Sequence, residues 1–173
     1  MARNRSITEA YCNHQFDCTP RFQECYGSIQ QSVSGHNPEE YALRNTILDY
    51  QQHSRYHIKL AKIMHSHNQF QACLILCDWA LTSMIKALYI QKYYAVNPPK
   101  EVTMNEILPL IHTDIEPGLD IALFIGTIRH MSSIEEFNQE QTLKPHNIKK
   151  LLQRTEEILM ELENRLNDEI ALN

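Results

Sequence analysis

The segment from residue 68 to residue 94 is apolar on nearly every side of a helical projection, which predicts a helix surrounded by other helices. Its main face is formed by residues at helical spacing, which are Phe70, Cys73, Leu74, Cys77, Leu81, Met84, Ile85 and Leu88. A second group thickens this stripe: Ala72, Ile75, Leu76, Trp79 and Ala80. Pro98 and Pro99 follow, and neither can continue a helix. The pattern therefore predicts one central helix that ends shortly before these prolines.

Four further segments show the one-sided apolar spacing of helices that pack against a core: 38–65, 103–111, 119–132 and 145–172. The second of them begins with Thr103 and Glu106 at the spacing of a capping box, and Pro109 limits or kinks it. Helices of this length joined by short loops form antiparallel bundles. We therefore predict an all-α fold, an up-and-down bundle of about five helices, over residues 38–173.

The first 37 residues have a different character and predict an N-terminal arm. Residues 1–19 are polar, and Thr19-Pro20 then offers an N-cap hydroxyl followed by proline at the first helical position. Four apolar residues follow at helical spacing: Phe22, Tyr26, Ile29 and Val33. We predict a short helix that docks on another surface, because an isolated helix of this length is marginal in water.

Composition supports a helical protein and limits the kinds of partner. The chain has 173 residues, of which 43% are hydrophobic and only 4 are Gly, and the low glycine content favours helices. The formal net charge of −5 argues against strong electrostatic binding to nucleic acid. No uncharged apolar run has the length of a membrane span, and the N-terminus lacks the apolar stretch of a signal peptide. We therefore expect a cytoplasmic protein without a membrane partner.

The five cysteines fit a reducing compartment. Cys73 and Cys77 lie one turn apart in the central helix, where a free thiol behaves as a small hydrophobic group. The others surround a histidine in the N-terminal arm: Cys12, His14, Cys18 and Cys25. These residue types can bind zinc, but they lack the Cys-x2-Cys pair of common structural sites. Ordinary reduced thiols are the favoured interpretation, and a zinc site is the alternative.

Several short motifs follow one another in an order that resembles a known family. In chain order they are Ala72 and Ala80, Lys86-Ala87-Leu88-Tyr89, a loop with Pro98 and Pro99, Ile107-Leu108-Pro109-Leu110-Ile111, Phe124 to His130, and a last helix over 142–166. This order is similar to that of the HEPN family of helical nucleotide-binding domains, over roughly residues 40–170. The resemblance implies a helical homodimer that binds a nucleotide, an RNA or a partner protein. Such proteins often act beside a minimal nucleotidyltransferase.

The chain departs from the family at the feature that makes some members ribonucleases. Those members carry an Arg-x4-6-His motif, in which arginine binds phosphate and histidine assists cleavage. No arginine here is followed by a histidine at that distance, and Arg129 is followed instead by Ile134, Glu135 and Glu136. Thr103 and Met104 also replace a histidine often found at the start of the short helix. The resemblance therefore implies a protein without ribonuclease activity.

Five residues are candidates for binding a nucleotide. Lys86, Tyr89 and Tyr93 lie on one side of the central helix near its C-terminal end, and Arg129 and His130 end another helix. If these helices pack together, the cations can hold a phosphate and the tyrosines can stack on a base. The alternative is structural, because a lysine on a core helix can extend to solvent while tyrosines pack around it.

A second hypothesis is a metal-dependent enzyme. Asp49, His53 and His57 follow one another at intervals of one helical turn, which places three metal-ligating residues on one face. Another helix would supply a further ligand, with His130 or Glu135 as donor, as in helical bundles of the DinB type. The cofactor would then be a divalent metal. The alternative is a solvated polar stripe, since glutamines and an arginine surround these residues.

The sequence thus leaves three hypotheses. The favoured one is a non-catalytic HEPN-type protein that binds a nucleotide or a partner and needs no cofactor. The second is the metal-dependent bundle. The third is a structural adaptor that dimerises through its last helix, where residues 151–172 carry leucines at near-heptad spacing.

Overall fold

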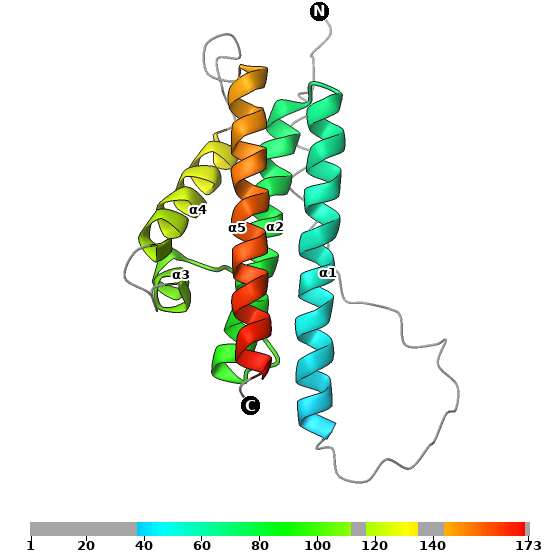
Figure 1. Ribbon diagram of the computed structural model, residues 1–173, viewed down its shortest axis with the longest axis vertical. Helices are drawn as coiled ribbons and strands as arrows, with labels where there is room; N and C mark the ends of the chain where they lie inside the picture. Colours follow the sequence, from blue (N-terminus) through cyan, green and yellow to red (C-terminus); the bar gives the residue numbers. More distant parts are fainter. Residues whose placement is uncertain (1–37, 112–116, 135–143, 172–173) are drawn as a thin grey trace, which may run out of the picture. The chain divides into compact units, whose positions relative to one another are not determined.

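Five α-helices make up the part of the chain that the computed structural model describes, which is residues 38–111, 117–134 and 144–171. They are α1 (Pro38–Ser66), α2 (Phe70–Tyr93), α3 (Met104–Ile111), α4 (Pro117–Ser133) and α5 (Pro145–Ala171), and these residues contain no strand (Figure 1). The predicted all-α fold is confirmed, and the predicted helix bounds agree to within a few residues. The helix predicted in the N-terminal arm, and the cysteines and histidine around it, lie outside the described residues.

Helix α2 lies at the centre of the bundle, as its all-round apolar pattern predicts. It contacts α1, α5, α4 and α3, and α1 and α4 run in the opposite direction to α2 and α5 (Figure 1). Its buried residues are Cys73, Leu74, Cys77, Ala80, Leu81, Ser83, Met84, Ile85, Ala87, Leu88 and Ile90. Full burial of one large apolar side chain stabilises a fold by about 1.5–3 kcal/mol, so α2 makes a large contribution to the core.

The apolar character of α2 raises the question of a membrane span. Among the described residues, this is the one helix long and apolar enough to cross a bilayer. About 61% of its most apolar window is buried against the rest of the protein, which is the usual situation of a central helix in a folded core. Length and composition are weak grounds for a span in such a helix, and the cytoplasmic location stays a prediction.

The turn between α1 and α2 depends on one asparagine. Asn68 has a φ of 58°, in the left-handed region that asparagine tolerates better than most residues. Gln69 then occupies the N-cap position of α2 without a capping bond from its side chain, and its carbonyl accepts a hydrogen bond from the amide of Cys73 at 3.0 Å. Asn68 therefore reverses the chain and does not cap α2.

Helix α5 packs its apolar stripe into the core. The buried residues of this stripe are Ile148, Leu152, Thr155, Ile158, Leu159, Leu162 and Leu166. The helix contacts both α2 and α1. The leucines at positions 152, 159, 162 and 166 are buried within the chain, whereas Leu151 is half-buried and Leu172 lies outside the described residues. Dimerisation through α5 stays a prediction.

Helix α3 begins with the predicted interaction between Thr103 and Glu106. The backbone amide of Thr103 donates to Oε2 of Glu106 at 2.7 Å, and the Thr103 hydroxyl donates to the same oxygen. These hydrogen bonds lower the pKa of Glu106 below its usual value. The contact fixes the point at which the chain leaves the loop after α2 and enters α3.

Candidate functional site

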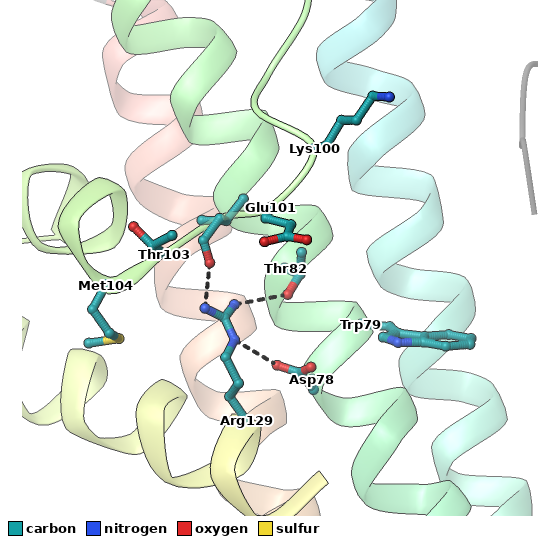
Figure 2. A pocket seen from close by; sticks show the side chains of 9 residues that line it. Asp78, Trp79, Thr82, Lys100, Glu101, Thr103, Met104 and Arg129 are labelled. Carbon is teal, nitrogen blue, oxygen red and sulfur yellow. Dashed lines mark hydrogen bonds and ion pairs between the residues drawn. The ribbon is translucent and has the colours of Figure 1, made fainter. Parts of the chain in front are cut away.

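A cavity of about 650 Å³ lies where α2 and α4 meet the segment that leads into α3. Its walls come from three parts of the chain: Asp78, Trp79 and Thr82 on α2, Arg129 on α4, and residues 100–104. Figure 2 shows Arg129 reaching from α4 towards Thr82 and the segment before α3. The volume is within the range of about 300–1,000 Å³ that is typical of small-molecule sites.

The guanidinium of Arg129 is held by three groups of the protein. Its Nη1 donates to the carbonyl of Val102 at 2.5 Å, and its Nη2 donates to the hydroxyl of Thr82 at 3.3 Å. Its Nε lies 3.5 Å from Oδ1 of Asp78 (Figure 2). An arginine has five N–H donors in a fixed plane. Two of them make these hydrogen bonds, and the contact with Asp78 is an ion pair, because Oδ1 of Asp78 has no hydrogen-bond partner among the described residues. The guanidinium therefore keeps N–H groups that a ligand can use.

Asp78 supplies the negative charge opposite Arg129. It is the one acidic residue of α2, and its side chain is only 17% exposed. Burial raises the pKa of Asp78 above its usual value, while the charge of Arg129 opposes that shift. The pair therefore sits in a partly desolvated wall, where a guanidinium interacts more strongly with an anion than it would in water.

Trp79 and Lys100 lie at the rim of the cavity. Both line it, but Figure 2 shows their side chains directed away from Arg129. Trp79 is 53% exposed, and its ring lies 5.6 Å from that of His57 on α1. An exposed indole of this kind offers a flat surface for stacking, and Lys100 adds a positive charge near the opening.

Of the five predicted ligand-binding residues, only Arg129 lines the cavity. Lys86 donates instead to the carbonyl of Lys100 at 3.2 Å and lies 5.9 Å from the centre of the Tyr50 ring. Burial lowers the pKa of Lys86 below its usual value. The structural alternative therefore describes Lys86 better than the ligand-binding hypothesis does.

The two tyrosines and the histidine of the predicted set also lie away from the cavity lining. Tyr89 and Tyr93 pack against each other with ring centres 4.7 Å apart, and His130 is exposed near the end of α4. Sequence reasoning missed the α2 residues Asp78, Thr82 and Trp79. A carboxylate inside an apolar helix was the available signal, since a buried acid requires a partner.

Four cations hold the segment from residue 100 to residue 111, of which residues 100–104 form one wall of the cavity. Each donates to a backbone carbonyl between residues 100 and 111: Lys86 to Lys100, Arg129 to Val102, Lys92 to Pro109, and Arg165 to Ile111. The last two act on the C-terminal carbonyls of α3, which lack partners within the helix and attract positive charge. Side chains of α2 and α4 therefore hold the cavity wall itself, and side chains of α2 and α5 hold the end of α3.

The described residues do not form the proposed metal site. The rings of His53 and His57 lie 6.5 Å apart along α1, and the described residues contain no group of three or more His, Cys, Asp or Glu side chains placed to hold a metal ion. Asp49 therefore does not complete a site with them, and neither does His130. The other donor considered, Glu135, lies outside the described residues. The His57 ring is instead in contact with aromatic neighbours, Trp79 on α2 and Tyr56 on its own helix.

His57 gives the fold a predicted dependence on pH. Burial lowers its pKa below the usual value of 6.5, and the nearby His53 adds to this because two positive charges repel. Below about pH 6.5 the unfolded chain therefore binds a proton at this position more readily than the folded protein does, and the free energy of unfolding decreases as pH falls.

We expect His57→Gln to weaken this decrease in urea titrations between pH 7.5 and pH 5 (roughly either side of the usual histidine pKa). His67→Gln, at an exposed position, is the control and should leave the slope unchanged, and equal slopes for all three proteins would contradict the assignment.

Comparison with known proteins found no family model and no curated protein that matches the chain. The HEPN resemblance stays a prediction that rests on the motifs themselves. A proposal for the function therefore has to rest on the geometry of the cavity and of the protein surface.

Proposed function

We propose that this protein is a non-catalytic binding protein of HEPN type, whose ligand is a nucleotide held in the cavity beside Arg129. The observation that carries the proposal is the guanidinium of Arg129, which two hydrogen bonds and one ion pair hold in the cavity wall, with N–H groups left over for a ligand. Guanidinium groups bind phosphate in a planar, bidentate manner. A fixed guanidinium loses little freedom when a phosphate binds, which favours affinity.

The other residues of the lining suggest how the rest of the ligand is held. Trp79 offers an aromatic surface for a base at the rim, and the Thr103 side chain adds a hydroxyl to the wall. Two cations, Arg129 and Lys100, are balanced by two carboxylates, Asp78 and Glu101. Because the carboxylates repel a highly charged ligand, we expect a nucleoside monophosphate to bind more tightly than a triphosphate.

The proposal includes no cleavage of the ligand. In the family's ribonucleases, four to six residues separate the arginine from the histidine that assists RNA cleavage, and no histidine stands at that distance after Arg129. Among the described residues, no histidine lines the cavity. A bound nucleotide would then act as a signal or as a link to a partner, such as the nucleotidyltransferase that the resemblance implies.

Isothermal titration calorimetry with adenosine monophosphate, adenosine triphosphate and a short single-stranded RNA tests the proposal. We expect the monophosphate to bind, and Arg129→Gln to weaken its binding by about tenfold or more through the loss of a charged hydrogen bond. Trp79→Ala should weaken it by a smaller factor. Arg154→Gln is the matched control, because Arg154 is an exposed arginine paired with Glu157 on α5. The proposal fails if no nucleotide or RNA gives heat, or if a folded Arg129→Gln protein binds as well as the original.

A further inference from the structure

A second cavity, with a volume of about 170 Å³, lies where α1, α2 and α5 meet. Its lining consists of three residues of α1, Met84 of α2 and four residues of α5. It shares no lining residue with the cavity beside Arg129. We call it the α1–α5 cavity.

One residue of this lining, Ser54 on α1, carries a buried hydroxyl that lacks a partner. Ser54 is 1% exposed, and its Oγ has no hydrogen-bond partner among the described residues. Hydroxyls elsewhere in the helices donate to the carbonyl four residues earlier, as those of Thr46, Ser83, Thr127 and Thr155 do. A buried hydroxyl without a partner costs free energy, because it has given up its hydrogen bonds to water. A ligand with a hydrogen-bonding group would supply the missing partner.

The rest of the cavity wall is largely apolar. Met84 and Leu159 are buried, Ile58 is half-buried, and Met160 lies at the rim with 66% of its surface exposed. Methionine is flexible, so it adapts to the shape of a ligand, and its sulfur makes favourable contacts with aromatic rings. Two methionines in one small cavity therefore favour an aromatic ligand.

The charged residues of the lining already have partners. Arg55 on α1 forms an ion pair with Glu163 on α5, and Glu156 on α5 forms one with Lys62 on α1. A charged ligand would have to break one of these pairs or leave water without a partner of its own, and either costs free energy. The lining therefore favours a neutral molecule.

The volume limits the size of that molecule. An engineered cavity of about 150 Å³ with apolar walls binds benzene in another protein. The α1–α5 cavity is slightly larger, so it has room for a single benzene ring with a small substituent. We propose that it is a second ligand site, which takes a neutral molecule of the size of phenol. The ring contacts the methionines and the ligand hydroxyl pairs with Ser54. This inference goes beyond the nucleotide site, and neither depends on the other.

Nuclear magnetic resonance of the full chain, with phenol, toluene and benzoate as probes, tests the site. We expect phenol to shift the backbone amide signals of the cavity lining in a saturable way, with a Kd on the order of 1 mM, because so small a molecule makes few contacts. Benzoate has a similar ring but a negative charge, and should bind at least about tenfold more weakly. The proposal is overturned if no probe gives saturable shifts at these residues up to about 20 mM, well above that Kd. Benzoate binding as tight as that of phenol overturns it as well.

The role of Ser54 is tested by comparing phenol with toluene, which has a methyl group in place of the hydroxyl. We expect Ser54→Ala to lower the affinity for phenol about fivefold relative to the affinity for toluene, through the loss of one hydrogen bond. Ser83→Ala is the matched control, because the buried hydroxyl of Ser83 already donates to the carbonyl of Trp79, and it should leave the ratio unchanged. A folded Ser54→Ala protein with an unchanged ratio overturns the proposal. So does a loss of stability in Ser54→Ala, measured by urea unfolding, because it would show that the hydroxyl already has a partner within the protein.

Discussion

Replacing Leu81 with alanine is expected to lower the free energy of unfolding by about 3–5 kcal/mol. Leu81 is fully buried near the middle of α2, the helix that contacts all four others. Alanine would remove three carbon atoms and leave a cavity that the surrounding helices can close only in part. The free energy of unfolding of a single domain is usually about 5–15 kcal/mol, so this change removes a large part of it.

Urea unfolding followed by far-ultraviolet circular dichroism measures the effect. The matched control is Leu123→Ala on α4, which is the same substitution at a side chain that is 60% exposed. We expect the control to change the free energy of unfolding by less than about 1 kcal/mol. Similar losses for both variants would show that α2 does not occupy the centre of the core.

Replacing Arg129 with methionine is expected to cost about 2–3 kcal/mol of stability, the second largest effect. The change leaves the Asp78 carboxylate without the charge that opposes its desolvation, and the carbonyl of Val102 loses its donor. Breaking a fully buried pair costs about 3–5 kcal/mol. We expect less here because the Arg129 side chain is 30% exposed.

A double-mutant cycle separates the ion pair from the rest of the loss. Asp78→Asn keeps the size of the side chain and removes its charge, so Arg129→Met should cost less in that background. The expected coupling is about 1–2 kcal/mol, since the pair is only partly screened by water. Arg154→Met provides the control, because its pair with Glu157 is exposed on both sides and should contribute less than about 1 kcal/mol. Zero coupling between Arg129 and Asp78 would mean that the two charges do not stabilise each other.

The helices were predictable because their apolar residues recur at a fixed spacing. The apolar stripe of α5 predicts a helix and the side that it buries, and the all-round apolar pattern of α2 predicts a helix covered on all sides. The role of Asn68 was not predictable in the same way. Asparagine suits both a helix cap and a left-handed turn, and the choice depends on backbone angles that the sequence does not display.

The site was predictable only in part. Arg129 stands out at the end of its helix, but its contacts come from α2 and from the segment before α3, which are far away in the chain. Lys86 shows a second difficulty, because its acceptor is a backbone carbonyl. Every residue has a carbonyl, so no residue type marks such an acceptor. The histidines of α1 show a third difficulty. Their spacing along one helix does not predict whether a second helix places another metal ligand beside them.

The central position of α2 has a consequence for the synthesis of the protein. Helix α1 leaves the ribosome before α2, but α3, α4 and α5, which cover its other sides, follow later. At roughly 5–20 residues per second, residues 94–171 take about 4–16 s to be made. During this interval part of the apolar surface of α2 is uncovered. Exposed apolar surface of this kind binds chaperones and promotes aggregation. A premature stop before α5 would make that exposure permanent, so such truncated chains are expected to be degraded rather than to retain partial function.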